Sequence, residues 1–191
     1  MSEQKKGGSA KMWGGRFGEG TAASVEAFTA SIHYDCRLYK YDIAGSKAHA
    51  AMLADSGILS KEELTAITDG LNAIELSIAK GTFEFKQELE DVHMNIEKAL
   101  VERIGPAGAK LHSGRSRNDQ VALDFKLYLR DQCDQLITLL DGIRRAFVLL
   151  ARKYLGEIMP GYTHMQRAQP VQIAHHMLAY YEMFGRDRAA D

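Results

Sequence analysis

The 191-residue sequence has little of several residue types, and each shortage excludes a class of protein. It has only two cysteines, Cys36 and Cys133. Cys133 lies on an apolar helix face, where a free thiol is expected, so we expect a reducing compartment. No segment approaches the ~18 consecutive apolar residues of a membrane span, and the polar residues 1–11 lack the apolar core of a signal peptide. We therefore expect a cytoplasmic protein with no membrane partner.

Motifs for charged partners and cofactors are also missing. The formal net charge of −1 argues against a nucleic-acid partner. There is no HExxH motif and no Cys/His cluster, and the adjacent His175 and His176 point to different faces of a helix, so no metal site is expected. No GxGxxG or P-loop motif is present, so nothing indicates a nucleotide cofactor.

What the sequence has is helical periodicity, and the predicted fold class is all-α. Hydrophobic residues make up 46% of the chain, no repeat or convincing strand is present, and Ser60–Glu63 has the pattern of a capping box. The expected helices are residues 25–31, 38–55, about 60–80, 91–104, about 119–156, and 170 to the end. We expect a disordered tail (1–12), a small N-terminal helical domain (13–112) and an incomplete helical-bundle domain (113–191).

The longest predicted helix carries a continuous apolar seam. Eight residues follow one another at alternating spacings of four and three, the pattern of a helix that packs along another helix: Leu129, Cys133, Leu136, Leu140, Ile143, Phe147, Leu150 and Tyr154. At 1.5 Å per residue this helix is roughly 55 Å long. A seam of that length predicts self-association or packing against further long helices.

A polar loop, His112–Gln120, precedes the long helix and allows two compatible interpretations. Ser116 or Asn118 would cap the helix, with Asp119 complementing its positive end. The same helix start, flanked by Arg115 and Arg117, would also bind a carboxylate or phosphate.

A second polar loop, Gly161–Pro170, follows the long helix. His164 is either a solvated loop histidine or an acid/base group, and the neighbouring Thr163 and Gln166 favour the second interpretation. Asp91 and His93, taken alone, predict a helix N-cap and a surface histidine. Because the two loops lie at opposite ends of one long helix, only antiparallel packing of several chains would bring them into one site.

Five segments together resemble the argininosuccinate lyase family of the fumarase/aspartase superfamily: Trp13–Phe17, Ser31–Asp35, Glu90–His93, Ser113–Gln120 and Gly161–Pro170. The resemblance implies a central bundle of long helices in a homotetramer whose sites draw on three subunits. It also implies the β-elimination of argininosuccinate to fumarate and arginine without a metal or organic cofactor.

The resemblance assigns roles to individual residues. It implies that His164 is the catalytic acid/base. The implied substrate-binding residues are Ser31, Arg117, Asn118 and Thr163, and the implied supporting residues are Asp35, Asp91, His93 and Gln166.

One family signature, a Gly-Ser-Ser-x-Met-Pro-x-Lys loop with a catalytic serine and a substrate-binding lysine, is absent from the sequence. We therefore expect the chain to be the N-terminal portion of such a lyase and to be inactive by itself. Two alternatives stay open: a non-catalytic relative resembling δ-crystallin or a self-associating helical module, and another lyase of the superfamily, such as adenylosuccinate lyase.

Overall fold

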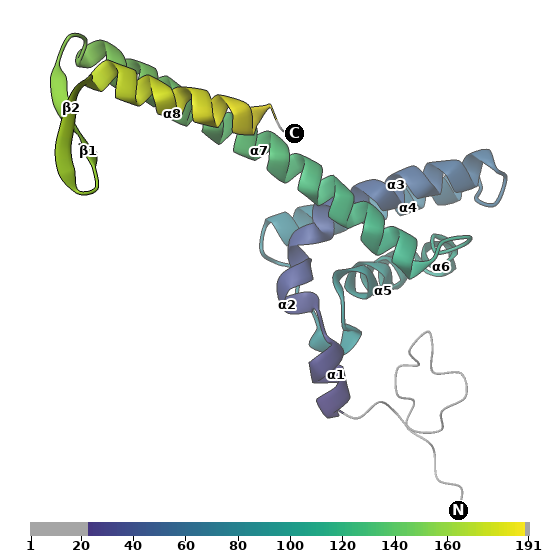
Figure 1. Cartoon of the computed structure of the whole chain (residues 1–191). Helices are drawn as coiled ribbons and strands as arrows, with labels where there is room; N and C mark the ends of the chain where they lie inside the picture. The colour runs from purple at the N-terminus through teal and green to yellow at the C-terminus, as the bar shows by residue number, and fades with distance from the viewer. Residues whose placement is uncertain (1–22, 190–191) are drawn as a thin grey trace, which may run out of the picture. The chain divides into compact units, whose positions relative to one another are not determined.

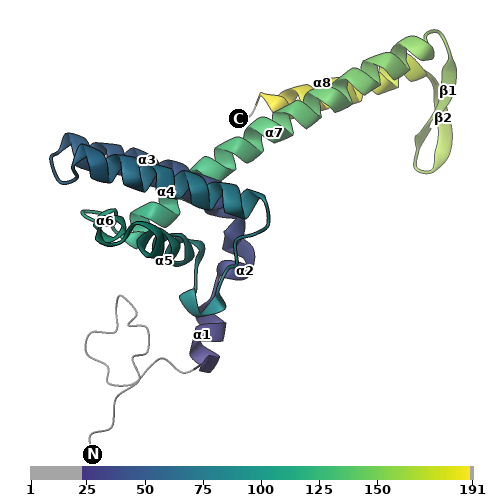
Figure 2. The ribbon, with the colours of Figure 1, turned by 180° about the vertical axis from the view of Figure 1, so that it is seen from behind.

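The computed structural model describes residues 23–189, so the expected tail and the Trp13–Phe17 segment lie outside the described residues. Figures 1 and 2 show the helical elements and one two-stranded hairpin. The α-helices are α1 (Ala23–Thr29), α2 (Ile32–Asp35), α3 (Tyr39–Asp55), α4 (Lys61–Ala79), α5 (Val92–Ile104), α6 (Pro106–Lys110), α7 (Arg117–Lys153) and α8 (Ile173–Arg188). The remaining elements are the 3-10 turns η1 (Cys36–Leu38) and η2 (Gln87–Leu89) and the strands β1 (Ile158–Thr163) and β2 (Gln166–Gln172).

The helical class is thus confirmed, and the described part of the chain forms two compact units that divide inside α7, between Phe125 and Lys126. The boundary expected at residue 112 stays a prediction. None of the described helices is both long and apolar enough to cross a bilayer.

The first unit is built on α4, which packs against both α3 and α5. Figures 1 and 2 both show α3 and α4 side by side. The apolar faces of these three helices form one buried core. Its largest fully enclosed members are Ile43, Leu53, Ile67, Leu71, Ile74, Val92 and Leu100. The helix ends follow local rules: the capping box opens α4, and Gly57 and Gly81, at φ 75° and 68°, follow the ends of α3 and α4.

In the second unit, α8 runs back along the second half of α7 (Figures 1 and 2). Phe147 of α7 stacks on Tyr180 and Phe184, with ring centroids 5.4 and 5.8 Å apart, and Arg188 pairs with Asp141 at 2.9 Å. Other seam residues remain open to solvent in the described chain; their exposed fractions are 43% for Leu129, 55% for Leu136, 43% for Ile143 and 40% for Leu150.

The expectation of no strand was wrong for the segment after α7. β1 and β2 pair antiparallel from Ile158 opposite Gln172 to Thr163 opposite Gln166, and α8 begins at Ile173 instead of Pro170. The side chains of residues 166–170 are all exposed, so the hairpin lacks the alternation of buried and exposed residues that reveals a strand in a sequence. The helix α5 ends at Ile104, as expected, and Pro106 then opens the short helix α6.

Candidate functional site

Several predicted site residues meet at the N-terminus of α5. Asp91 caps the helix by accepting a hydrogen bond from the Met94 N–H at 2.7 Å, as its sequence pattern predicted. Asp35 Oδ1 accepts a second bond from the Val92 N–H at 3.2 Å, and its Oδ2 accepts the Ser31 hydroxyl at 2.6 Å. Two carboxylates and one hydroxyl therefore surround this helix start.

The approach of Ser31 to α5 depends on an unusual backbone at Glu90. Glu90 has φ 65°, and its carbonyl accepts the N–H groups of Ser31 and Ile32 at 2.8 and 3.0 Å. A left-handed conformation is costly for a residue with a side chain, and such strain clusters at functional sites. Burial raises the pKa of Asp35, and the charge of Asp91 adds to the rise against the opposing hydrogen bond from Ser31.

His93, in the first turn of α5, is buried instead of lying at the surface, so that expectation was wrong. It is 2% exposed, and its Nδ1 lies 3.1 Å from Asp42 Oδ1 of α3 and 3.3 Å from Asp124 Oδ2 of α7. The side-chain amide of Gln120, one turn before Asp124, also donates to Asp42 Oδ1. A polar cluster of Asp42, His93, Gln120 and Asp124 is thus enclosed between three helices.

The titratable groups in this cluster shift one another's pKa values. Burial raises the pKa of Asp124 to about 7, and the neighbouring Asp42 charge adds to the rise. Burial alone would raise the pKa of Asp42, but the hydrogen bond and charge of His93 outweigh it and lower that pKa. Burial likewise opposes the charged imidazole, yet the Asp42 contact raises the pKa of His93 above 6.5.

The spacing of the cluster would geometrically admit a cation, because one ligand atom each from Asp42, His93 and Asp124 lies within 4.8 Å of the others. The contacts of these three side chains favour a bound proton over a bound metal ion. His93 Nδ1 already hydrogen-bonds Asp42, and the Arg115 guanidinium supplies positive charge beside both carboxylates.

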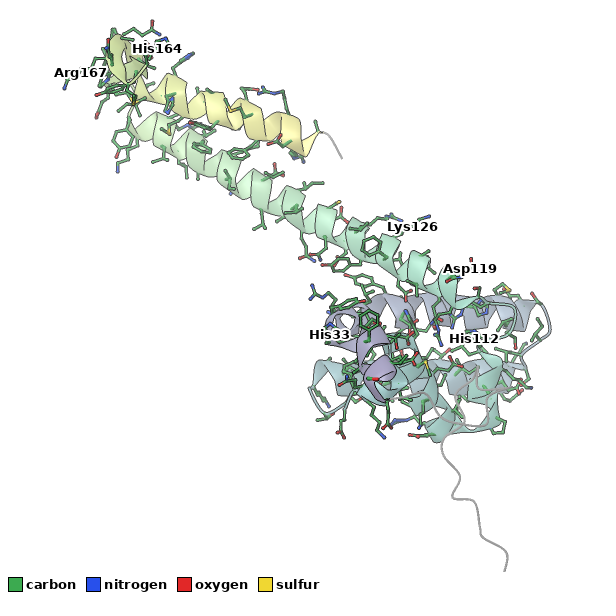
Figure 3. The ribbon with its side chains drawn as sticks, turned by 60° about the horizontal axis from the view of Figure 1, so that its bottom comes forward. His33, His112, Asp119, Lys126, His164 and Arg167 are labelled. Atoms are coloured by element: carbon green, nitrogen blue, oxygen red, sulfur yellow. The ribbon has the colours of Figure 1, made fainter. Side chains whose placement is uncertain are left out.

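Of the two caps that the sequence allowed for α7, Ser116 and Asn118, the structure shows Ser116, whose hydroxyl accepts the Asn118 N–H at 3.2 Å. The Asn118 side chain is exposed at this first turn. Arg117 is engaged within the chain, donating to Gln120 Oε1 at 2.8 Å and to Glu97 Oε2 at 3.0 Å. Figure 3 marks the segment by His112 and Asp119.

A pocket of about 300 Å³ opens between α3 and this turn. Its polar lining comes from His49, Arg115, Asp119, Gln120 and Asp124, so it reaches the edge of the buried cluster.

In the second unit, His164 and Met165 form the hairpin turn between β1 and β2. Figure 3 labels His164 at this end of the unit. Both have left-handed backbones, with φ 50° and 60°, and the flanking Thr163 and Gln166 pair across the turn. Two-residue hairpin loops of this type usually need glycine or asparagine. The side chains of residues 162–170 are exposed, so Thr163, His164 and Gln166 are presented to solvent in the described chain.

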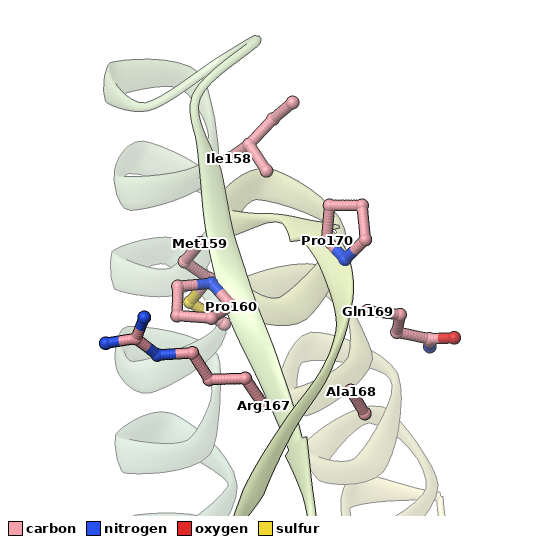
Figure 4. A pocket seen from close by; sticks show the side chains of 7 residues that line it. All are labelled: Ile158, Met159, Pro160, Arg167, Ala168, Gln169 and Pro170. Atoms are coloured by element: carbon pink, nitrogen blue, oxygen red, sulfur yellow. The ribbon is translucent and has the colours of Figure 1, made fainter.

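A second pocket, of about 370 Å³, lies along the base of this hairpin (Figure 4). It is lined by Ile158, Met159, Pro160, Arg167, Ala168, Gln169 and Pro170. The pocket lining therefore excludes His164.

The structure thus places the predicted residues in two groups. Ser31, Asp35, Asp91, His93, Arg117 and Asn118 belong to the first unit, and Thr163, His164 and Gln166 belong to the second. Sequence reasoning missed Asp42, Gln120 and Asp124. The only local signal was the spacing of four between Gln120 and Asp124, which a solvated helix face shows equally often.

Comparison with known proteins adds to this geometry. A family model described as Lyase matches residues 15–190. An argininosuccinate lyase from Desulfotalea psychrophila is 70% identical over 188 residues, which are 98% of this chain and 40% of that protein. An argininosuccinate lyase from Syntrophotalea carbinolica is 56% identical over 185 residues, covering 96% of this chain and 40% of the relative. The chain therefore spans about 40% of the length of these curated relatives.

Solved structures agree in fold. An EDDS lyase variant with bound fumarate is 33% identical at a TM-score of 0.69, covering 80% of this chain and 29% of that one. A fumarate lyase from Mesorhizobium sp. BNC1 has a TM-score of 0.67 at 21% identity, covering 91% of this chain and 40% of that one, and shows the fold alone.

Proposed function

The chain belongs to the lyase family that its sequence matches over residues 15–190, and from this premise we propose that it supplies part of the active site of an argininosuccinate lyase. The observation that carries the proposal is the 70% identity to the Desulfotalea argininosuccinate lyase over nearly the whole chain. The reaction would be the β-elimination of argininosuccinate to fumarate and L-arginine, in the cytoplasm and in arginine biosynthesis. The fumarate bound to the related EDDS lyase is consistent with a fumarate-releasing site.

In this reaction a base removes the proton from the carbon next to a carboxylate, and hydrogen-bond donors stabilise the resulting aci-carboxylate. The carbon–nitrogen bond then breaks, and an acid protonates the departing guanidino nitrogen. We assign the acid/base role to His164, whose exposed imidazole stands on the hairpin turn. No metal or organic cofactor is required by this scheme.

Substrate binding is assigned to Ser31, Asn118 and Thr163, with Arg117 helping to hold a carboxylate. The exposed amide of Asn118 at the first turn of α7 supports this assignment, because a helix N-terminus favours anions. The supporting residues are Asp35, Asp91, His93 and Gln166. Asp35 and Asp91 order the start of α5, which agrees with a supporting role.

We also propose that the working protein is a homotetramer held by the exposed seam of α7. Leu136, at 55% exposure, lies on that seam in the described chain. A Leu136→Lys variant should therefore lower the mass measured by light scattering. The control Leu155→Lys, at a 77% exposed position beyond the helix, should leave the mass unchanged. Equal masses for Leu136→Lys and wild type would exclude the seam as the interface.

The test of the activity is a chimera in which this chain replaces the matching 40% of the Desulfotalea enzyme. Fumarate release from argininosuccinate, followed by ultraviolet absorbance, should be robust in the chimera and absent with the 191-residue chain alone. His164→Ala should lower kcat of the chimera at least ~100-fold, whereas His175→Ala on the exposed face of α8 should not.

Adenylosuccinate, offered to the same chimera, should not be turned over. A folded chimera that cleaves adenylosuccinate instead would replace the proposed substrate. A folded chimera that cleaves neither substrate would favour a non-catalytic relative.

A further inference from the structure

The buried cluster of Asp42, His93, Gln120 and Asp124 joins three helices at a point that the proposed reaction does not explain. Asp42 comes from α3, His93 from α5, and Gln120 and Asp124 from α7. Asp42 and Asp124 are 1% and 0% exposed, so both carboxyl groups are removed from water. Enclosing two carboxylates side by side is costly unless protons or partners neutralise them.

The hydrogen bonds show which group lacks a partner. Asp42 Oδ1 accepts from both His93 Nδ1 and the Gln120 amide. Neither carboxylate oxygen of Asp124 has a hydrogen-bond partner among the described residues. His93 Nδ1 approaches Asp124 Oδ2 at 3.3 Å, but a single N–H cannot serve both acids fully. A neutral Asp124 that donates its own proton to Asp42 resolves this imbalance.

We propose that Asp42 and Asp124 share one proton beside His93, and that this proton-sharing cluster positions the first turn of α7 against α3 and α5. The charged groups that face Asp124 are Asp42, His93 and Arg115. With Asp124 neutral, one acidic charge on Asp42 lies among the basic groups His93 and Arg115, so the cluster carries no excess negative charge.

Gln120 connects the cluster by hydrogen bonds to Arg117, one of the candidate substrate-binding residues. Its amide nitrogen donates to Asp42, while its amide oxygen accepts from Arg117 at 2.8 Å. Arg117 in turn reaches Glu97 of α5 at 3.0 Å. The cluster therefore fixes the Arg117 guanidinium. The consequence for substrate binding rests on the proposed function, whereas the shared proton does not.

The shared proton is tested by urea unfolding of the 191-residue chain between about pH 4 and pH 8. Asp124→Asn keeps a donor toward Asp42 but cannot ionise. Because the pKa of Asp124 is raised to about 7 in the folded chain, the wild type should lose stability as pH rises from about 4 to about 7. Asp124→Asn should lack this loss, so its urea midpoint should rise relative to wild type over that range.

Asp42→Asn is the matched variant, since it removes the negative charge that His93 and Gln120 contact and replaces one acceptor oxygen of Asp42 by an NH₂ donor. Its urea midpoint should fall well below that of Asp124→Asn at every pH, or the variant should not fold. Parallel pH profiles for wild type and Asp124→Asn, or equal midpoints for the two asparagine variants, would overturn the shared proton. Stoichiometric Zn²⁺ binding measured by calorimetry and lost in Asp124→Asn would overturn it in favour of a cation site.

The chimera tests whether the cluster positions Arg117, because a loss of positioning should change KM much more than kcat. Gln120→Met keeps the side-chain length without its hydrogen bonds and should raise KM for argininosuccinate about tenfold, with kcat changed less than about threefold. Asp124→Asn should keep kcat/KM within about threefold of wild type near pH 6. An unchanged KM in Gln120→Met would refute positioning. An inactive chimera would refute the proposed function and leave the unfolding test of the shared proton intact.

Discussion

Arg117 Nη2 lies 3.0 Å from Glu97 Oε2, so an ion pair joins the first turn of α7 to α5. The two side chains are only 20% and 17% exposed, which limits screening by water. The pair therefore orients the Arg117 guanidinium within the chain itself. Arg117 is the residue that, by the family resemblance, would hold a carboxylate of the substrate.

Glu97→Gln should destabilise the chain by about 1–2 kcal/mol, because the ion pair with Arg117 becomes a hydrogen bond to an uncharged acceptor in a half-buried place. Chemical denaturation at neutral pH measures this loss. Glu75→Gln is the matched control: Glu75 pairs with Lys47 at 2.9 Å, but the side chains are 38% and 28% exposed. That change should cost under ~1 kcal/mol. Equal losses in the two variants would contradict the role given to the Arg117 pair.

A contrast between two helical glycines tests the packing of the first unit. A Cβ atom built on Gly70 of α4 would lie 2.6 Å from Leu100 Cδ1, so Gly70→Ala should overpack the core and cost about 1–3 kcal/mol. Gly142 of α7 has no described atom within 4 Å of the same position. Gly142→Ala should therefore raise stability by up to about 1 kcal/mol through helix propensity. Thermal unfolding measures whether the melting temperature falls in Gly70→Ala and rises in Gly142→Ala, as expected. A higher melting temperature for Gly70→Ala would refute the close contact with Leu100.

Local sequence signals predicted the helices well, because caps and apolar periodicity act over a few residues. Ser60, Asp91 and Ser116 all cap as their patterns indicate. The long helix, expected at about 119–156, is Arg117–Lys153. The roles of the candidate residues at the α5 N-terminus were found through family resemblance. The Asp91 cap was predicted from its own pattern, whereas the contacts of Asp35 with Val92 and Ser31 came only from the structure.

The parts that sequence reasoning missed depend on contacts between distant segments. His93 and Asp42 are 51 positions apart, and nothing near either residue shows that the other will enclose it. The hairpin was missed for another reason: its stability comes from backbone pairing and a tight turn, and its exposed side chains leave no periodic pattern.

The hairpin turn carries a prediction of its own. Met165 has φ 60° and is 96% exposed, so it bears backbone strain without burying its side chain in the described chain. Met165→Asn suits this left-handed conformation and should stabilise the hairpin by about 0.5–1 kcal/mol. Amide hydrogen exchange across β1 and β2 measures the change. Ala168→Asn, in the exposed middle of β2, is the control and should weaken the strand. Faster exchange in Met165→Asn would show that methionine is the better residue at this turn.

Finally, His93 makes stability depend on pH near neutrality. Burial opposes its charged form, but the Asp42 contact outweighs burial and raises the folded-state pKa above 6.5. The folded chain therefore holds the imidazolium proton more tightly than the unfolded chain does. The stabilisation is fully present below about pH 6.5 and is lost as pH rises through the folded pKa.

His93→Gln should remove this dependence, so the difference in urea midpoint from wild type should be largest near pH 6 and shrink toward pH 8. His33→Gln, at an exposed position, should keep the wild-type pH profile. If the His93→Gln profile falls with pH as steeply as that of the wild type, the group that titrates is not His93.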